Sequence, residues 1–590
     1  MNSQYFILHD GYWECDVLRH FPYPEPRKGQ LELIGSILGA IEGGGITVIE
    51  APSGLGKTAS VLTAISCFSE HKRAKFIYAV RTHSQVSRVM EECGKFSKLR
   101  VAALRGKGEL CINWRVKKIK NNDLMVEACR GLRRSGSCPY YEPKGVQGPR
   151  CYDPLSSTSG FCPYYESIAT IRGGNYDALV LCYPYLFDPE LGLPMSFSRS
   201  EVYLIVDEAH NLRKYWISKR IAVIDSSELE FLPRFRDIVK SLREAGLPYL
   251  KLPKDYFLCL LRSHRSEDAS EGIVRFLDWA IDEVKSASSV LLEPPNLILV
   301  KEGGKKLEEI FKPFKACVLI SGTWSEEVAR GEVLDDLRYE RISMRRWGEV
   351  YSTIIKDFTT KFEERSRMEF YRIASALSDL SDVIIGNMGI FTSSYDVLQG
   401  ILDAGFENML EKPLFVERRD MDSQELTRMI SEFKRISKTG AVLLGVQGGR
   451  SSEGEDFPGL QMTTSVIVGM QLAKPNALGR IQEVLWRKFT RLQNPNLINA
   501  CRVAVQAAAR PVRSSKDVGF IVFADVRFSK CISMMPDWMK APLRYLSLSE
   551  LAVAAQEFFK GRTATLVRMG DALEDLPLGG ESSRDEGGSP

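Results

Sequence analysis

The sequence predicts an α/β protein with two doubly wound parallel sheets, and two observations carry this prediction. Short apolar runs typical of buried parallel strands alternate with longer helical stretches along most of the 590 residues. One such run, ITVIE at 46–50, leads directly into the glycine-rich stretch APSGLGKT at 51–58, and a helical stretch follows. A strand, a glycine-rich loop and a helix in this order form the phosphate-binding unit of α/β folds.

The strand-type runs fall into two sets. The first set comprises 46–50, 76–80, 178–182, 202–206 and 317–320. The second set comprises 383–385, 413–416, 442–444, 465–468 and 519–523. Helical stretches such as 59–68 and 423–438 lie between the runs, so each set predicts one half built from βαβ units. Residues 226–245 and 254–286 have helical spacing without strands, which predicts an α-helical insert.

The composition predicts a cytoplasmic protein. The N-terminus has no basic stretch followed by an apolar core, and the chain has no run of about 18 apolar residues that could span a membrane. The net charge of +4 is small, but residues 101–170 hold eleven Lys and Arg against six Asp and Glu. The last residues, 571–590, are acidic and rich in Gly and Ser, and we expect a disordered tail there.

The loop at 51–58 predicts binding of ATP and Mg²⁺. Its glycines let the backbone fold around phosphate oxygens, Lys57 would reach the β- and γ-phosphates, and the Thr58 hydroxyl would help hold Mg²⁺. The predicted ATP contacts are Ala51, Pro52, Ser53, Gly54, Leu55, Gly56, Lys57 and Thr58. Ala51 stands where the general pattern has Gly, so the match rests on Gly54 and the Gly-Lys-Thr triplet.

A second nucleotide motif, VDEAH at 206–210, ends the apolar run EVYLIV. Asp207 would contact Mg²⁺ through its water shell, and Glu208 would orient and deprotonate the attacking water, because a carboxylate beside the metal can act as the base for hydrolysis. His210, one of six histidines, would couple this site to neighbouring elements, or it is an ordinary hydrogen-bonded core histidine.

Five of the thirteen cysteines lie in the basic segment 101–170, namely Cys111, Cys129, Cys138, Cys151 and Cys162. In a reducing compartment, clustered cysteines favour metal binding over disulfides. Four thiolates suit either Zn²⁺ or an iron–sulfur cluster, and free buried cysteines remain the alternative. The spacing is wide and lacks the Cys-x-x-Cys pairs that are usual in structural zinc sites.

Local context separates these five cysteines. Cys138 and Cys162 are each followed by Pro-Tyr-Tyr-Glu, as if they packed around one centre, whereas Cys151 lacks this context and is the spare. The remaining cysteines are scattered, and we expect them to be core or surface thiols: Cys15, Cys67, Cys93, Cys182, Cys259, Cys317, Cys501 and Cys531.

A phosphate loop paired with DEAH is identified as the hallmark of superfamily-2 helicases, and nearly all of residues 21–528 resembles the iron–sulfur branch named after XPD. FPYPEPRKGQ at 21–30 resembles the upstream adenine-sensing element of that branch, with Arg27 and Gln30 as the polar readers. VRTHSQ at 80–85 is similar to the element that grips the nucleic-acid backbone, which implies DNA contacts by Arg81 and Thr82.

Three further motifs complete the resemblance. ISGTW at 320–324 is similar to the element that joins hydrolysis to domain movement. GGRSSEGEDF at 448–457 resembles the SEG-x-DF element, which implies an ATP contact by Asp456, although Glu455 replaces an apolar residue. QAAARPVR at 506–513 is similar to Q-x-x-G-R-x-x-R with Ala509 in place of Gly. It implies catalytic roles for Gln506 and for the arginine fingers Arg510 and Arg513.

The resemblance also implies a domain plan. Residues 1–100, 171–211 and 293–338 form a first RecA-like domain, 101–170 a 4Fe–4S domain, 212–292 an α-helical arch, and 339–570 a second RecA-like domain. The implied cluster ligands are Cys111, Cys129, Cys138 and Cys162. ATP would bind between the two RecA-like sheets, and the cluster domain would part the duplex.

The implied activity is that of a monomeric, ATP-dependent DNA helicase that moves 5′ to 3′ on single-stranded DNA, unwinds forked duplexes and serves DNA repair. Lys107, Arg115, Lys117 and Lys118 are candidate phosphate contacts, and Trp114 and Tyr140 are candidates for base stacking, unless this basic stretch is only a solvated face. The alternative is a nucleic-acid-binding ATPase switch whose cluster senses redox state. A P-loop kinase fails on the DEAH motif and on the second half of the chain.

Overall fold

The computed structural model describes residues 6–9, 13–52, 54–119, 122–142, 149–173, 176–187, 201–265, 271–303, 306–342, 348–449, 451–452, 457–472, 476–492, 494–512 and 517–562. Four of the predictions above lie outside these residues. They concern Ser53, Asp456, Arg513 and the tail at 571–590.

The chain divides into two compact units. The first unit comprises Met1–Ser343 and Ala473–Asn496, and the second comprises Met344–Leu472 and Leu497–Pro590. Helix α20 (Ala477–Phe489) therefore belongs to the first unit, although the strands before and after it in the sequence belong to the second. In the first unit the ring of Phe489 packs edge-on against Trp216, and Arg220 lies over the same tryptophan. The predicted domain boundaries themselves stay a prediction.

The first unit is built on an eight-stranded parallel sheet in the order β14-β3-β13-β8-β4-β7-β5-β6. The strands are β3 (Gly45–Glu50), β4 (Lys75–Val80), β5 (Val101–Leu104), β6 (Cys151–Tyr152), β7 (Ala178–Cys182), β8 (Val202–Val206), β13 (Ala316–Ser321) and β14 (Arg338–Arg341). Its central strands are buried along their whole length, as expected for strands covered on both faces. All five predicted runs of the first set are confirmed as strands.

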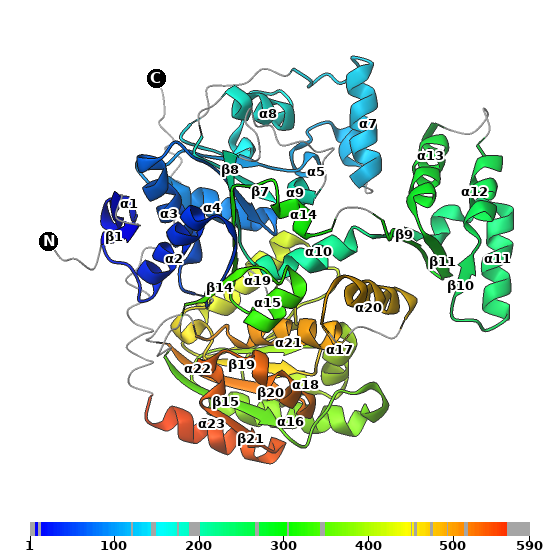
Figure 1. The fold of residues 1–590 in the computed structure, drawn as a ribbon. Helices are drawn as coiled ribbons and strands as arrows, with labels where there is room; N and C mark the ends of the chain where they lie inside the picture. The colour runs from blue at the N-terminus through cyan, green and yellow to red at the C-terminus, as the bar shows by residue number, and fades with distance from the viewer. Residues whose placement is uncertain are drawn as a thin grey trace, which may run out of the picture. The chain divides into compact units, whose positions relative to one another are not determined.

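The order of these strands brings the sequence motifs together. The phosphate loop follows β3, ISGTW ends β13, VDEAH ends β8 and VRTHSQ begins at the end of β4, and these four strands are neighbours in the sheet. Parallel strands present their carboxyl ends at one edge, which is where ligands bind in open α/β sheets. Helix α2 (Gln30–Gly43) precedes β3, α3 (Lys57–His71) follows the phosphate loop, and α4 (His83–Gly94) follows β4. The three helices lie in the same region of the ribbon (Figure 1).

The insert after β8 holds helices on an antiparallel sheet. Its strands are β9 (Ile221–Asp225), β10 (Leu250–Leu252), β11 (Ser289–Glu293) and β12 (Asn296–Val300), in the order β10-β11-β12-β9. Helices α11 (Pro233–Glu244), α12 (Lys254–Ser263) and α13 (Glu271–Ser286) share one apolar core with this sheet and stand beside it in Figure 1. The helices predicted for this insert are confirmed, but the prediction that it contains no strands was wrong. Two of the strands have a weak sequence signal, because β10 has only three residues and Val223 of β9 faces solvent.

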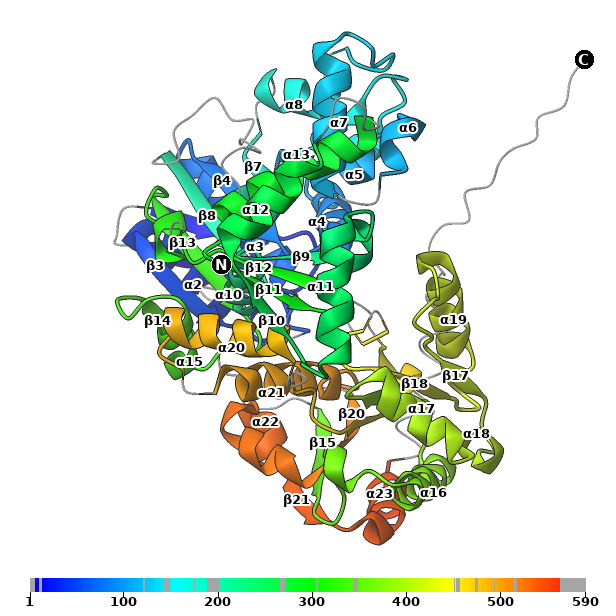
Figure 2. The ribbon, with the colours of Figure 1, turned by 90° about the vertical axis from the view of Figure 1, so that its right-hand side faces the viewer.

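The second unit is built on a seven-stranded parallel sheet in the order β17-β18-β16-β19-β20-β15-β21. The strands are β15 (Glu349–Ile355), β16 (Met388–Thr392), β17 (Leu414–Val416), β18 (Val442–Val446), β19 (Thr464–Val468), β20 (Val518–Ala524) and β21 (Leu543–Leu546). Helices α16 (Arg367–Val383), α17 (Tyr395–Asp403) and α23 (Leu551–Lys560) share a core on one face, and α19 (Ser423–Arg435) and α21 (Pro495–Ala508) share another core (Figure 2). The predicted pair of doubly wound sheets is confirmed.

One predicted strand of the second set is wrong. Residues 383–385 are the end of α16 and the connection after it, and the strand is β16, three residues further on. Gly386 separates the two apolar runs VII and MGIF with a left-handed backbone, φ +79°. The run VII continues the apolar face of the helix, whereas MGIF is the strand. Both runs are apolar, so only the turn at Gly386 shows which of them is the strand.

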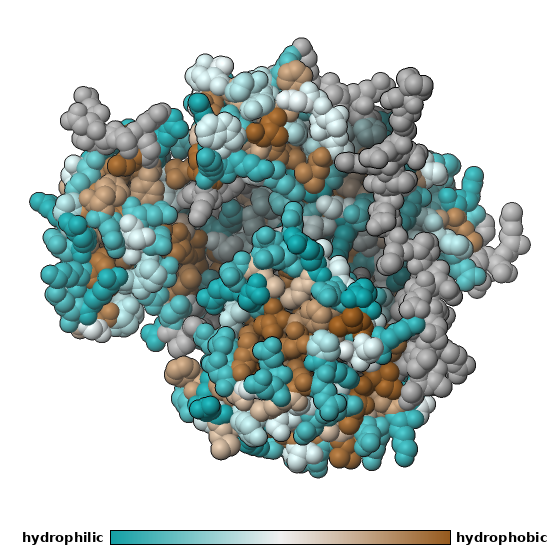
Figure 3. All heavy atoms as spheres, turned by 180° about the vertical axis from the view of Figure 1, so that it is seen from behind, coloured by the Kyte–Doolittle hydropathy of each residue, from teal (hydrophilic) through white to brown (hydrophobic). Residues whose placement is uncertain are grey.

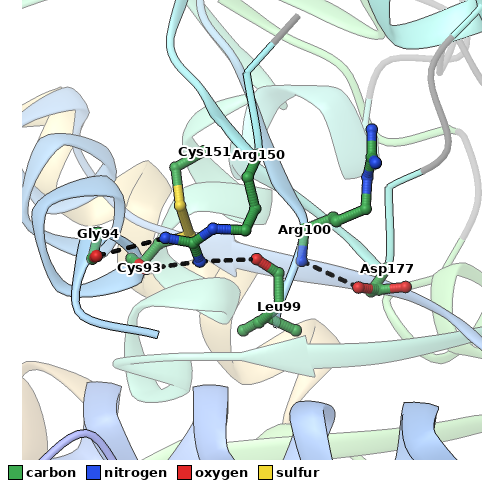
Figure 4. The surroundings of a disulfide bond; sticks show 7 residues. All are labelled: Cys93, Gly94, Leu99, Arg100, Arg150, Cys151 and Asp177. Atoms are coloured by element: carbon green, nitrogen blue, oxygen red, sulfur yellow. Dashed lines mark hydrogen bonds between the residues drawn. A yellow bond between two sulfur atoms is a disulfide. The ribbon is translucent and has the colours of Figure 1, made fainter. Parts of the chain in front are cut away.

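Disulfides connect several cysteines that we expected to be free thiols. Cys93 is bonded to Cys151, Cys501 is bonded to Cys531, and Cys67 is also disulfide-bonded. Figure 4 shows the first of these bonds, with Arg150 donating hydrogen bonds to the carbonyl oxygens of Gly94 and Leu99 beside it. The expectation failed because β6 brings Cys151 beside the end of α4, a pairing across 58 residues that spacing does not reveal.

Among the described residues, no helix combines the length and the apolar character needed to cross a membrane. On the face seen in Figure 3 most side chains are hydrophilic, and brown, apolar residues gather mainly in the lower part of the view.

Candidate nucleotide site and cysteine-lined cavity

The phosphate loop has the backbone that its glycines allow. Gly54 and Gly56 are left-handed, with φ of +82° and +85°. A Cβ on Gly56 would lie 2.4 Å from Nε2 of Gln30, so a larger residue would displace this amide and would also be strained at the positive φ. The Gln30 amide donates to the carbonyl of Gly56 at 3.3 Å, and Arg27 Nη1 donates to the carbonyl of Gly54 at 3.0 Å. The fold therefore brings both residues of the 21–30 element to the loop, and their role as adenine readers stays a prediction.

The two Gly-to-Ala departures from the motifs fit the backbone. Among the described residues, Glu208 is the one non-glycine with a positive φ, so neither Ala51 nor Ala509 needs the freedom of glycine. The buried Ala51 donates its N–H to the carbonyl of Ser321 at 2.8 Å, which ties the start of the loop to the end of β13.

The acidic pair lies directly opposite the loop lysine. Lys57 Nζ is 3.4 Å from Oε1 of Glu208, and His210 Nδ1 is 3.4 Å from Oε2 of the same carboxylate. The hydroxyl of Tyr78 donates to Oδ2 of Asp207 at 3.3 Å and also reaches Thr58. Asp207 and Thr58, the two residues expected at Mg²⁺, are thus neighbours around one phenol.

The electrostatics of the pair differ between the two carboxylates. Burial raises the pKa of Asp207 to about 6. Burial acts in the same direction on Glu208, but Lys57 and His210 outweigh it and lower the pKa of this carboxyl below its usual value. The lowered pKa favours the ionised form of Glu208, which a general base requires. A desolvated carboxylate beside a hydroxyl is a donor set that fits a hard cation such as Mg²⁺.

His210 connects the acidic turn to β13. Its Nδ1 lies 2.9 Å from Oγ of Ser321 in the ISGTW motif, and its Nε2 lies 2.9 Å from the amide of Asn211. The side chain is almost completely buried. Both predicted alternatives therefore describe it, because it is a satisfied core histidine and it bridges two motifs.

The four cysteines expected to bind a cluster line one apolar cavity. Cys111 follows α5 (Lys107–Leu110), Cys129 lies in α7 (Asn122–Arg134), Cys138 lies in the turn after α7, and Cys162 precedes α8 (Pro163–Gly173). All four are free thiols. Asn113 donates from Nδ2 to Sγ of Cys138 at 3.7 Å, and the Cys162 N–H donates to the carbonyl of Tyr140 at 2.8 Å.

The arrangement of the thiols bears on which metal group fits. Among the described residues, no three His, Cys, Asp or Glu side chains converge closely enough to hold one metal ion. Thiolates that bind Zn²⁺ all lie about 2.3 Å from a single point. The four cysteines instead share the lining of one cavity with three tyrosines, Tyr140, Tyr141 and Tyr165.

The predicted DNA contacts of this segment fall into two groups. Trp114 is 59% exposed, with Lys118 Nζ 4.8 Å and Arg115 5.4 Å from its ring, and Lys117 is also exposed. Lys107 instead lies over the rings of Tyr164 and Tyr165, at 5.0 and 5.4 Å, and Tyr140 lines the cysteine cavity. The structure therefore brings Lys107 and Tyr140 to the cavity and leaves the Trp114 group at the surface.

Sequence reasoning missed the residue that connects this insert to α4. Arg105 is completely buried, and its guanidinium binds both carboxylate oxygens of Asp153 at 2.7 and 2.6 Å. It also donates to Glu109 at 3.0 Å and, on α4, to Oγ of Ser87 at 2.9 Å. His83 of α4 pairs with the same Glu109 at 2.7 Å. A lone arginine after a strand gives no signal of this network.

At the N-terminal end of α4, the VRTHSQ motif forms a capping box. Thr82 accepts a hydrogen bond from the N–H of Gln85, and the Gln85 side chain accepts from the N–H of Thr82. Arg81 accompanies them and is half-buried. In the second unit, Gln506 lies on α21, and the buried Arg510 donates to the carbonyl of Ser452 in the SSEGEDF stretch.

Comparisons with known proteins agree with this arrangement. A model of the DEAD_2 family matches residues 78–229, and a model described as "Helicase C-terminal domain" matches residues 377–542. The XPD helicase subunit of general transcription and DNA repair factor IIH from Dictyostelium discoideum is 22% identical, over 92% of this chain and 91% of its own length. The corresponding XPD/RAD3 subunit from Saccharomyces cerevisiae is 21% identical, over 96% of both chains.

A solved structure titled "XPD_Helicase" has the same fold, with a TM-score of 0.59, 19% identity, and coverage of 89% of this chain and all of that one. Two helicase family models thus match in chain order, each on one of the two parallel sheets, and the relatives align over nearly their whole length. The chain belongs to the XPD-type helicases of superfamily 2 and is an ATP-dependent DNA helicase.

Proposed function

We propose that the chain hydrolyses ATP to move 5′ to 3′ along single-stranded DNA and to unwind forked duplexes, in the repair of DNA. The observation that carries the catalytic part of the proposal is the close approach of Lys57 and Glu208 at the carboxyl ends of β3 and β8. Support for a role in repair or transcription comes from the relatives, whose names place them in a transcription and DNA repair factor.

The residues of the nucleotide site have distinct roles in this proposal. Lys57 would leave Glu208 for the β- and γ-phosphates when ATP binds, which frees the Glu208 carboxylate to take a proton from the attacking water. Asp207 and Thr58 would hold Mg²⁺, which supplies positive charge to the phosphates when bound. Gln506, Arg510 and Arg513 would act on the nucleotide from the second RecA-like domain, together with Asp456.

We also propose that Cys111, Cys129, Cys138 and Cys162 hold a 4Fe–4S cluster. Bound there, the cluster would join four segments of the insert through sulfur and could carry one electron. The four cysteines are half-buried in a largely apolar lining, and Asn113 supplies a hydrogen-bond donor to one sulfur. Lys107 and Arg133 lie against the Tyr165 ring beside this cavity and would offset its negative charge.

DNA contacts are proposed at two places. Arg81 and Thr82 would bind the phosphate backbone at the start of α4, and Trp114 with Arg115, Lys117 and Lys118 would contact the strand at the surface of the insert. An exposed indole between two cations suits a nucleic acid, because a base can stack on the ring while the cations pair with phosphates.

Strand displacement on forked duplexes tests the proposal. A fork with only a 5′ single-stranded tail should be unwound in the presence of ATP and Mg²⁺, and a fork with only a 3′ tail should not. If neither fork is unwound while DNA still stimulates hydrolysis, the alternative of a redox-sensing ATPase switch is the better description. Visible absorption of protein purified without oxygen tests the cluster independently, with a broad band near about 400 nm expected for iron–sulfur and none for Zn²⁺.

A further inference from the structure

We propose that Tyr183 is a positioning residue that connects the DNA-contacting segment 80–85 to the hydrolytic turn at Asp207 and Glu208. The inference rests on the proposed function of that turn. Tyr183 belongs to none of the motifs discussed above. It follows β7 directly, in the stretch LCYPYLF, and its side chain is 1% exposed.

The hydroxyl of Tyr183 binds the backbone of the turn at two successive residues. Its single proton is shared between the carbonyl of Asp207 at 2.6 Å and the carbonyl of Glu208 at 3.0 Å. The ring is fixed edge-on against Tyr215, with centroids 6.1 Å apart. A buried phenol with two backbone acceptors and a packed ring has little freedom to move, so it defines where these two carbonyls lie.

The turn needs such support because of its conformation. Glu208 has φ of +49°, in the left-handed region that residues with a Cβ disfavour. In this turn the Glu208 carboxylate lies 3.4 Å from Nζ of Lys57. Without a group that holds both carbonyls, the turn can relax to a more favourable conformation and move the carboxylate away from the reacting water.

The backbone of Tyr183 is hydrogen-bonded to the segment 80–85. Its N–H donates to the carbonyl of Val80 at 3.1 Å, and Val80 is the first residue of the VRTHSQ segment. A shift of the segment on DNA would therefore reach the turn through one residue.

A neighbouring tyrosine offers a matched control. Tyr185 lies two residues further on, in α9 (Pro184–Phe187), and is also buried. Its hydroxyl donates to the carbonyl of Arg105 at 2.9 Å, at the base of the cysteine-containing insert, and not to the DEAH turn. Replacing either tyrosine by phenylalanine removes one buried hydroxyl and leaves the ring. Tyr185→Phe also removes a hydrogen bond to the Tyr164 side chain, but no partner that it loses belongs to the DEAH turn.

The first experiment compares ATP hydrolysis by Tyr183→Phe and Tyr185→Phe with and without single-stranded DNA. We expect kcat of the DNA-stimulated reaction to fall about tenfold in Tyr183→Phe, the size of one lost hydrogen bond, with KM for ATP unchanged within about twofold. The stimulation by DNA should fall as well. Tyr185→Phe should keep kcat and the stimulation. Equal losses in both variants, or normal turnover in Tyr183→Phe, would overturn the inference.

A double-mutant cycle with Glu208→Gln separates positioning from a general loss of structure. If Tyr183 acts through the Glu208 side chain, Tyr183→Phe should cause no further loss of single-turnover rate in the Glu208→Gln background. A further tenfold loss there would show that the hydroxyl acts on something else. Glu208→Gln by itself tests the proposed function, because normal turnover in that variant would contradict the role of the turn whatever Tyr183 does.

Discussion

Lys57 and Glu208 face each other, with 3.4 Å between Nζ and Oε1, so the loop cation and the carboxylate proposed as the base neutralise each other in the absence of ATP. Nucleotide phosphates would compete with the carboxylate for the lysine. ATP binding and activation of the base would thus be one event.

This relationship gives the first prediction. Lys57→Ala and Glu208→Gln should each abolish DNA-stimulated ATP hydrolysis, because each loses several kcal/mol of transition-state stabilisation, about 3 kcal/mol or more. Phosphate release in the presence of single-stranded DNA measures this. Far-ultraviolet circular dichroism should show an intact fold. Glu70→Gln, an exposed carboxylate on α3, is the control and should hydrolyse ATP normally.

The second prediction concerns Arg510. Arg510→Lys should bind ATP nearly as well as the wild type yet hydrolyse it about 10³-fold more slowly, because a finger arginine acts on transition-state charge through its planar guanidinium. Nucleotide binding measured by fluorescence and single-turnover hydrolysis check the two parts. Arg435→Ala, on the exposed end of α19, should change neither. A collapse of affinity with unchanged turnover per bound ATP would make Arg510 a binding residue.

The third prediction separates hydrolysis from unwinding. Cys138→Ser should lose the visible absorption of the cluster and the unwinding of forks, while it keeps much of its hydrolysis on single-stranded DNA. The reason is that the thiols line a cavity within the insert, whereas the nucleotide motifs lie at the edge of the main sheet. Cys259→Ser, an exposed free thiol, should keep all three properties. Normal unwinding by the Cys138→Ser protein would show that unwinding does not depend on the proposed cluster.

The fourth prediction concerns the Cys93–Cys151 disulfide. Cys151→Ser should keep the cluster absorption, because Cys151 is bonded to Cys93 and does not line the cavity. It should lower the free energy of unfolding by about 2–4 kcal/mol, the usual contribution of a disulfide that closes a long loop. Thermal unfolding with and without reductant measures this. Reductant should destabilise the wild type and have less effect on the variant, and loss of cluster absorption would mean that Cys151 is a ligand.

The fifth prediction concerns Arg105. Arg105→Gln should cost about 3 kcal/mol of stability, because it removes a completely buried cation and leaves the half-buried carboxylate of Asp153 without its partner. Arg105→Lys should recover only part of this, since lysine cannot bind both oxygens of Asp153 in the same geometry. Arg134→Gln, exposed on α7 of the same segment, is the control. Denaturant unfolding of all three proteins gives the comparison, and wild-type stability in Arg105→Gln would contradict it.

The parts of the fold that the sequence predicted are those with a strong local signal. Strands such as 202–206 are uninterrupted apolar runs and are buried on both faces, so their pattern identifies them. In the sheet of the insert, β10 and β9 gave a weak signal, because β10 is short and β9 is half-exposed, whereas β12 is a buried apolar run that the prediction missed. For the strand at Met388–Thr392, the prediction chose the neighbouring helix end instead, because both segments are apolar.

The residues of the candidate site also differ in how strong their sequence signal is. Glycine-rich and acidic motifs could be read from the chain, because the chemistry of a phosphate loop requires those residues in that order. Tyr183 and Arg105 could not, because Tyr183 binds Asp207 and Arg105 binds Asp153, each more than 20 positions away in the sequence. Such a contact depends on which strands are neighbours in the sheet. The pairing of Cys93 with Cys151 is hidden for the same reason.

That disulfide also closes the backbone from residue 93 to residue 151 into a covalent ring, with Cys111, Cys129 and Cys138 inside it and Cys162 outside. A peptide bond cut anywhere within the ring leaves one molecule, held together by the sulfur bridge. Gel electrophoresis of a nicked sample would therefore show a single full-length band without reductant and two fragments with it. Proteolytic damage to the cluster-binding segment would go unnoticed in any assay that follows only the size of the oxidised protein.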